Sequence, residues 1–328
     1  MSSREAGEGP IALGEMQAIR SWERAARAQL KAQKKTQARI VDAAAASGEP
    51  RGDTLYQHSV LCQTFLPYRD PGESVREWER TNGHIHLKLL AGEAFDNERG
   101  RWMKLGLPFG TKARLVLMYI NQLAVRSQCP RIELEESLTA FVRRTLRMDP
   151  KGRNIRAVKD QLGRLSACSI RLGSGARSQI GRTTNPISLV EGFEMWSPKD
   201  AHQRVLWPTT VELSAAYWET LKTHAVPLDE RHIVALSPNG MALDIYAWLA
   251  QRLHRIPGPG PVLVTWPQLR NQLGAEIALL HNFRREFRGA LRQVLALYRE
   301  ARIEDTPEGL LLRHSPPIVK PRMMLVCG

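Results

Sequence analysis

Two short segments of the sequence combine arginine and asparagine side chains at helical spacing. Residues 153–159 read RNIRAVK, and residues 281–288 read HNFRREFR. A guanidinium group can make two parallel hydrogen bonds to guanine, and a carboxamide can make two to adenine. The same groups also bind phosphate oxygens, which fixes orientation without reading sequence. The chemistry that these residues could perform is non-covalent contact with duplex DNA.

Each segment opens a predicted amphipathic helix, one beginning near Gly152 and the other spanning 281–299. Apolar residues recur every three to four positions, which indicates that one face of each helix packs on a core. The polar groups lie in the first turns, the part that reaches base edges when a helix enters a groove. The apolar stripes are Ile155, Val158, Leu162 and Leu165 in the first helix, and Phe283, Phe287, Ala290, Leu291, Val294 and Tyr298 in the second.

The elements around the two helices follow one order, which is that of a winged helix: helix, strand, helix, basic helix and hairpin. The two units share this pattern without sequence identity. The pattern predicts an α+β fold with two tandem winged-helix domains, in which Thr111 and Thr265 cap helices. The first unit has predicted helices at 114–126 and 137–148, and strands at 131–134, 169–172, 187–195 and 204–213. The second has helices at 243–253 and 266–273, a strand at 262–264, and a hairpin at 302–304 and 310–313.

The candidate DNA-binding residues lie on the two basic helices and in a Gly-, Ser-, Thr- and Arg-rich loop at 173–186 that has the composition of a wing. We expect them to contact both bases and phosphates. They are Lys151, Arg153, Asn154, Arg156, Lys159, Arg164, Arg177, Arg182, Asn282, Arg284, Arg285, Arg288 and Arg292.

The positive charge of the chain is concentrated in three places. The net charge is +14 over 328 residues, of which 43% are hydrophobic. Residues 151–182 carry +7, residues 281–302 carry +4, and residues 15–46 carry +4, so the remainder is close to neutral. A basic balance of this size indicates a polyanionic partner. Residues 15–46 read equally well as an exposed, partly helical basic arm or as a solvated linker helix.

The chain is long enough for two cores. We predict a basic, partly disordered arm at 1–53, a first winged-helix domain at 54–225 and a second at 226–328. The four cysteines have no CxxC or metal-ligand spacing, which favours a reducing compartment. No apolar run approaches the ~20 residues of a membrane span, and no signal-peptide core is visible. We expect a cytoplasmic bacterial protein that needs no cofactor or metal.

One enzymatic alternative comes from His84 and His86, because a His–apolar–His pair on a strand can hold a divalent metal. Rolling-circle relaxases combine such a pair with a tyrosine nucleophile and a lysine three residues later. None of Tyr119, Tyr217, Tyr246 and Tyr298 is followed by that lysine. No phosphate loop, GxSxG or HExxH motif occurs. Two strand histidines facing solvent or a subunit interface are the better interpretation, and we expect no catalysis.

Several segments resemble the plasmid-encoded RepA replication-initiator family of proteobacterial plasmids. The most distinctive are LPFGTKARL at 107–115, DQLGRL at 160–165 and LDIYAWLA at 243–250. Shorter ones are 132–134 with Ser137 and Leu138, then 204–208 and 226–229. The resemblance extends over about residues 55–315, which leaves the basic arm outside it.

The resemblance implies a plasmid replication initiator. Such a protein would bind repeated double-stranded sites (iterons) at the plasmid origin, help to open AT-rich DNA, and recruit the host initiator and replicative helicase. It also implies exchange between monomers and dimers, and repression of its own promoter. A winged-helix transcriptional repressor without a replication role remains an alternative that the sequence cannot separate from this one.

Overall fold

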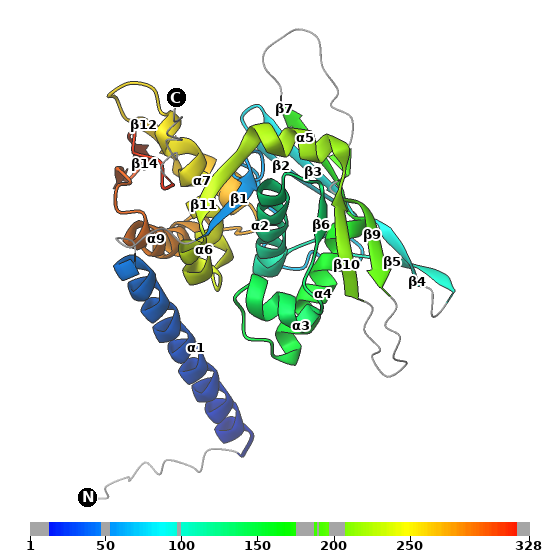
Figure 1. The fold of residues 1–328 in the computed structure, drawn as a ribbon. Coiled ribbons are helices and arrows are strands. Elements are labelled where there is room, and N and C mark those ends of the chain that lie inside the picture. The colour runs from blue at the N-terminus through cyan, green and yellow to red at the C-terminus, as the bar shows by residue number, and fades with distance from the viewer. Residues whose placement is uncertain are drawn as a thin grey trace, which may run out of the picture.

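Helices and small antiparallel sheets are mixed along the whole chain (Figure 1). The computed structural model describes residues 13–46, 53–96, 100–174, 187–188, 190–196 and 207–319. Most of the predicted wing loop at 173–186, with Arg177 and Arg182, lies outside these residues, as do residues 204–206 of a predicted strand. The α+β part of the sequence prediction is therefore confirmed.

The N-terminal helix α1 (Leu13–Ala45) projects from the body of the molecule (Figure 1). Its sequence is rich in Ala, Gln, Lys and Arg, all good helix formers, and contains no proline. Only its last turns are anchored, because Ile40 and Ala43 are buried while residues 20–35 are exposed. This end packs on α6 (Glu230–Leu236) and α9 (Leu280–Leu297).

The N-terminal half of the body packs helices against two sheets. One sheet has the strand order β2-β3-β7-β8, and the other has the order β6-β10-β9. A separate hairpin of β4 and β5 extends to one side (Figure 1). The strands are β1 (Thr54–His58), β2 (Glu77–Asn82), β3 (Ile85–Leu90), β4 (Glu93–Asp96), β5 (Arg101–Lys104), β6 (Arg131–Glu133), β7 (Ser169–Ser174), β8 (Ile187–Ser188), β9 (Val190–Trp196) and β10 (Trp207–Leu213). The helices are α2 (Gly110–Ser127), α3 (Leu138–Ala140), the π-helical turn η2 (Phe141–Thr145), α4 (Gly152–Ala167) and α5 (Ala215–His224).

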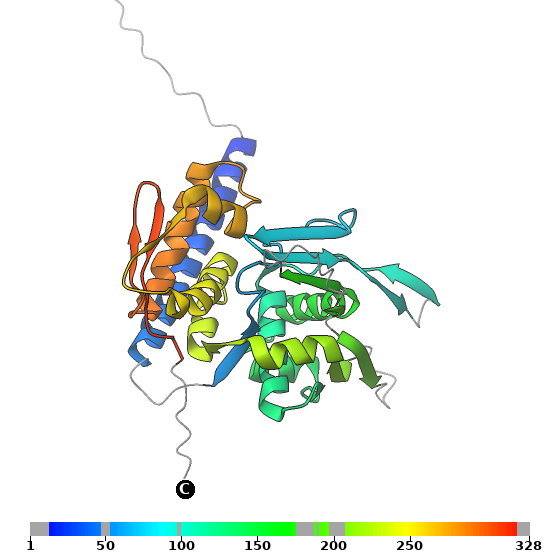
Figure 2. The ribbon, with the colours of Figure 1, turned by 90° about the horizontal axis from the view of Figure 1, so that it is seen from above.

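The C-terminal half, coloured from yellow to red in Figure 2, builds one three-stranded sheet of order β12-β14-β13, on which α8 packs, while α9 packs on α7 and α8. Its elements come in the predicted order of helix, strand, helix, basic helix and hairpin. They are β11 (Ala225–Asp229), α6, α7 (Gly240–Arg252), η3 (Leu253–Arg255), β12 (Val262–Thr265), α8 (Trp266–Leu273), α9, β13 (Ile303–Asp305) and β14 (Gly309–Leu312).

The starts of α8 and α2 differ in whether the local sequence determines where the helix begins. Thr265 caps α8 as predicted, in a capping box with Gln268. The predicted cap Thr111 is wrong, because α2 already begins at Gly110 and its N-cap is Phe109. The free N–H of Phe109 donates to the Gln161 side chain at 2.7 Å, so a distant helix supplies the acceptor that a capping side chain would provide.

The predicted helix at 137–148 is also shorter and less regular than expected. Ser137 caps α3 through a hydrogen bond from the Ala140 N–H, and the chain then passes into η2, which ends at Thr145. Arg147 follows with a φ of 51°, a left-handed conformation that no helix continues through.

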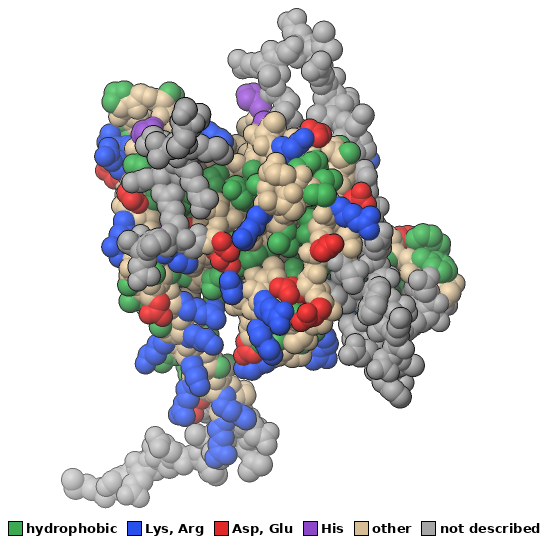
Figure 3. All heavy atoms as spheres, in the orientation of Figure 1, with side chains coloured by type: hydrophobic (Ala, Val, Ile, Leu, Met, Phe, Trp, Pro, Cys, Tyr) green, Lys and Arg blue, Asp and Glu red, His purple; other side chains and the backbone are tan. Residues whose placement is uncertain are grey.

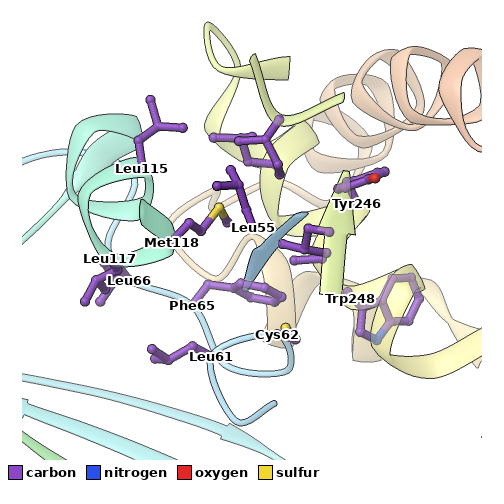
Figure 4. Close-up of a cluster of buried hydrophobic side chains, with 14 of the residues drawn as sticks. Leu55, Leu61, Cys62, Phe65, Leu66, Leu115, Leu117, Met118, Tyr246 and Trp248 are labelled. Atoms are coloured by element: carbon purple, nitrogen blue, oxygen red, sulfur yellow. The ribbon is translucent and has the colours of Figure 1, made fainter. Parts of the chain in front are cut away.

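The two halves of the body share one core. Leu55 on β1, Phe65 on the next loop, Met118 on α2 and Tyr246 on α7 belong to one buried cluster, as Figure 4 shows. β1 pairs with β11 in an antiparallel ladder from 54 to 58 and from 225 to 229. This ladder crosses the boundary predicted at 225–226, so the division into two domains stays a prediction.

A buried ion pair also joins the halves. Arg114 on α2 contacts Asp244 on α7 through two bonds, Nε to Oδ1 and Nη2 to Oδ2, both of 2.7 Å. Their side chains are 2% and 5% exposed. Burial raises the pKa of the Asp244 carboxyl, and the guanidinium opposes that rise. Arg114 further donates to the carbonyls of Leu66, Pro67 and Gly110, so its N–H groups are well satisfied.

Candidate nucleic-acid interface

The first turns of α4 and the polar face of α9 line the same cleft, although about 130 residues separate them in sequence. The cleft has a volume of about 2120 Å³, and α1 and the start of α2 form further walls. Figure 3 shows the notch between α1 and the rest of the molecule, with Lys and Arg side chains along it. The predicted residues that line the cleft are Lys151, Arg153, Asn154, Asn282, Arg285 and Arg292.

α4 brings three of these residues to the cleft because its apolar stripe is fixed to the core. Val158, Leu162 and Leu165 are buried as predicted, and the helix packs on α2. The N-terminal turn, which starts after Pro150, is left exposed with Arg153 at its outer face. The amide of Asn154 donates to the carbonyl of Asp149 at 2.8 Å, so its oxygen remains available as an acceptor.

α9 likewise has one face buried in the core and one face on the cleft. Phe283, Phe287 and Val294 are fully buried, and the opposite face borders the cleft. Arg285 donates to the Asn282 side chain at 3.2 Å, which holds the two groups beside one another on the first turn and a half of α9. An arginine and an asparagine in contact on an exposed helix face are a suitable pair for hydrogen bonds to base edges.

The charge inside the cleft is positive. Its lining contains nine Lys or Arg side chains and four acidic ones, a net of +5. Burial and the nearby charge of Arg153 lower the pKa of Lys112, which indicates that cations are crowded at this wall. The acidic lining residues are Asp149, Asp160, Glu276 and Glu286, and Lys151 lies 2.9 Å from Asp149.

Sequence reasoning missed five basic residues of this lining, namely Lys35, Arg39, Arg69, Lys112 and Arg147. Lys35 and Arg39 belong to the basic segment at 15–46. The charge count therefore predicted that this segment is basic, but not that these two residues line the cleft. Nothing in the sequence connects Arg69, in an irregular loop, with α4 or α9. Arg147 is also paired with Glu230 at 3.4 Å.

Three predicted DNA-binding arginines have partners inside the protein. The Arg164 guanidinium lies 3.0 Å from Asp160 and 3.2 Å from Asp70, and its side chain is 14% exposed. Arg284 and Arg288 both lie over the ring of Trp266, at 5.4 and 4.9 Å from its centre.

Arg288 also makes a two-bond contact with Asp305 on the closing hairpin. None of these three arginines lines the cleft, and their role in DNA binding stays a prediction. Arg156 and Lys159 are exposed on α4, outside the cleft lining, and their role too stays a prediction.

The histidine pair considered for metal-dependent catalysis lies at the start of β3, with His84 in the turn before the strand and His86 on the strand. His84 and His86 are both exposed, and the Nδ1 of His86 is 3.1 Å from the hydroxyl of Thr81. In the described part of the chain, no group of three or more His, Cys, Asp or Glu side chains is placed to hold a metal ion. The described helices also include none that combines the length and apolar character of a membrane span.

Comparisons with known proteins give one family and two solved structures. Residues 107–268 match the family model of plasmid encoded RepA protein, a range that includes α2 and α4 but ends before α9. The chain is also similar to the selenomethionine crystal structure of domains 2 and 3 of RctB, with 12% identity, 72% of this chain and 83% of that chain covered, and a TM-score of 0.45.

A second crystal structure of RctB domains 2 and 3 gives 11% identity, covers 74% of this chain and 83% of that chain, and has the same TM-score of 0.45. The curated proteins include no match. Across residues 107–268, the chain belongs to the family of plasmid-encoded RepA proteins, the replication initiators that its sequence resembles.

Proposed function

We propose that this protein is a plasmid replication initiator that binds repeated double-stranded DNA sites at the plasmid origin through the cleft between α4 and α9. The observation that carries the proposal is the convergence of the two basic helices on one cleft with a net charge of +5. The family to which residues 107–268 belong supports the replication role.

Each half of the protein would act as a winged helix. Two facts support this. In the C-terminal half, α7, β12, α8, α9 and the β13–β14 hairpin follow in the order expected of that motif, with the first strand pairing to the last. In the N-terminal half, α2, β6, α3, α4 and the β9–β10 hairpin come in the same order, and β6 likewise pairs with the last strand, β10. Here η2 precedes α4, and β7 and β8, which join the sheet of β2 and β3, stand between α4 and the hairpin.

Within the cleft, the basic side chains would neutralise phosphates and the first-turn groups would reach bases. Phosphate contacts by several cations predict affinity that falls steeply with salt. Arg153 and Arg285 are the best candidates for base contacts, because both lie on the first turn or turn and a half of an exposed helix. Opening of AT-rich DNA, recruitment of the host initiator and helicase, monomer–dimer exchange and autorepression are further parts of the proposal that rest on the family alone.

The cleft is tested with Arg153→Ala and Arg285→Ala and with DNA from the region upstream of the gene. Footprinting identifies the protected repeats, and fluorescence anisotropy measures affinity for a repeat and for random DNA. Each substitution should weaken specific binding by about 1–3 kcal/mol, the usual cost of a lost base contact. Arg143→Ala is the matched control, because Arg143 is an exposed arginine on η2 that does not line the cleft.

Equal losses for the control and for both cleft variants would rule out the cleft as the binding site. Losses that are the same on the repeat and on random DNA would make Arg153 and Arg285 phosphate contacts only. The replication role has its own test, a plasmid that carries only this gene and its upstream region. If that plasmid does not replicate in a host without other initiators, the protein is a DNA-binding repressor.

A further inference from the structure

α1 carries a second basic surface, which we call the outer stripe and define as Arg20, Arg24, Arg27, Lys31 and Lys34. The spacing alternates between four and three residues, so at about 100° per residue the five side chains fall within about 40° of one line along the helix. No other residue between 20 and 34 falls in that sector. This side of α1 is therefore uniformly basic, and all five residues are exposed.

The outer stripe faces away from the cleft. The α1 residues that line the cleft include Gln29, Ala32, Gln33 and Thr36, which are centred about 160° around the helix axis from the stripe. Lys31 and Lys34 belong to the same stretch of helix, yet neither lines the cleft. A nucleic acid held in the cleft would therefore meet the side of α1 that carries Lys35 and Arg39, and the stripe would be left free.

The position of the stripe is fixed by contacts at the other end of α1. Arg231 donates to the carbonyl of Ala46 at 2.6 Å, and Arg299 donates to that of Ala44 at 3.3 Å. Both cations lie at the C-terminal end of the helix, where they satisfy unpaired carbonyls and favour the helix dipole. Among the described residues, no ion pair is recorded for the five stripe side chains. The stripe is therefore a row of exposed cations on an anchored helix, with Glu23 as the acidic residue beside it.

We propose that the outer stripe binds the phosphate backbone of a second stretch of nucleic acid, separate from the one in the cleft. The five residues span about 21 Å, which corresponds to about six base-pair steps of duplex DNA. If each cation neutralises one phosphate, the stripe contributes up to about 4.5 to the slope of log affinity against log salt. This proposal rests on the proposed function in one respect: the proposed function is what brings the protein to DNA.

The test compares the full chain with a variant in which all five stripe residues are changed to Gln, which has similar helix propensity. The matched control is Ala26→Gln with Ala28→Gln, at two exposed positions of the same helix that belong neither to the stripe nor to the cleft lining. Affinity for a random-sequence duplex is measured over a series of salt concentrations, and far-UV circular dichroism checks that helicity is kept. The stripe variant should lose several-fold in affinity at low salt and reduce the salt slope by about 2 to 4.5. The control should change neither.

An unchanged affinity and slope in the stripe variant would overturn the proposal. So would a variant that still binds DNA normally but no longer binds polyglutamate, because the partner would then be an acidic protein. A cleft variant with Arg153, Arg285 and Arg292 changed to Ala separates the two proposals. If it binds like the unmodified protein while the stripe variant does not, the stripe proposal stands and the cleft proposal falls. If the cleft variant keeps some binding, and that binding disappears when the stripe changes are added, the result would support both the cleft proposal and the stripe proposal.

Discussion

Replacing Asp244 by alanine should destabilise the whole protein, because the change leaves a buried guanidinium without its counter-charge. The Arg114–Asp244 contact has two bonds of 2.7 Å, and both side chains are at most 5% exposed. Water cannot replace the lost carboxylate, while the three backbone carbonyls that also accept from Arg114 satisfy hydrogen bonds but not charge. Removing one partner of such a pair costs about 3–5 kcal/mol. That loss is large beside a typical folding stability of about 5–15 kcal/mol.

Urea unfolding followed by circular dichroism measures this loss. The matched control is Lys222→Ala, which removes the exposed pair with Glu219 and should cost less than about 1 kcal/mol. The double variant Arg114→Met with Asp244→Leu should be more stable than Asp244→Ala alone, because no unpaired charge remains. A cost for Asp244→Ala as small as that of the control would refute the reasoning. A double variant less stable than Asp244→Ala would show that packing and not charge sets the cost.

Two further predictions concern buried positions. Burial and the charge of His224 lower the pKa of His58 to about 4, and its Nδ1 accepts the Val60 N–H. Its contribution to stability should be complete above pH ~6.5 and fall by up to about 3 kcal/mol as pH drops toward 4, since the unfolded chain takes up the proton first; urea midpoints at several pH values measure it. Gly274→Ala should cost about 1–3 kcal/mol in thermal unfolding, because the new Cβ would collide with the ring of Phe283.

Each of these predictions has a clear contrary result. His58→Asn keeps an acceptor for the Val60 N–H but does not titrate, so a pH dependence that survives this change would have another source. For Gly274, an alanine variant as stable as the unmodified protein would mean that the Phe283 ring moves aside without cost.

The sequence predicted well what neighbouring residues decide. The cap of α8 by Thr265 depends on Gln268 three residues later, and both are visible in the sequence. The apolar stripes of α4 and α9 are local periodicities, and every expected residue is buried except Ile155, which is half-buried. The start of α2 was not predictable in this way, because the groups that accept from its first N–H groups, Gln161 and the Pro67 carbonyl, belong to other elements.

For the candidate site too, the sequence predicted what neighbouring residues decide and missed what depends on distant elements. That Arg153 and Arg285 lie on exposed helix faces follows from helical spacing, but that both faces border one cleft depends on contacts between distant elements. Arg164 and Arg288 have the same residue type and spacing as the cleft arginines. Their acidic partners, Asp70 and Asp305, lie 94 and 17 residues away. The sequence does show Asp160 four residues before Arg164, a spacing that favours an ion pair on one helix, but nothing in it marks the contacts with Asp70 and Asp305.

The ladder between β1 and β11 has a consequence for the spacing of the DNA sites that the protein could bind. It joins the half that carries α4 to the half that carries α9, and the two helices are thereby held at one separation. If both helices bind DNA as proposed, the protein's own backbone would set the distance between the two DNA segments that it contacts. Inserting base pairs between those segments would then cost the energy of twisting DNA back into phase. Sites of the wrong spacing would be rejected even if every base that the protein contacts were correct.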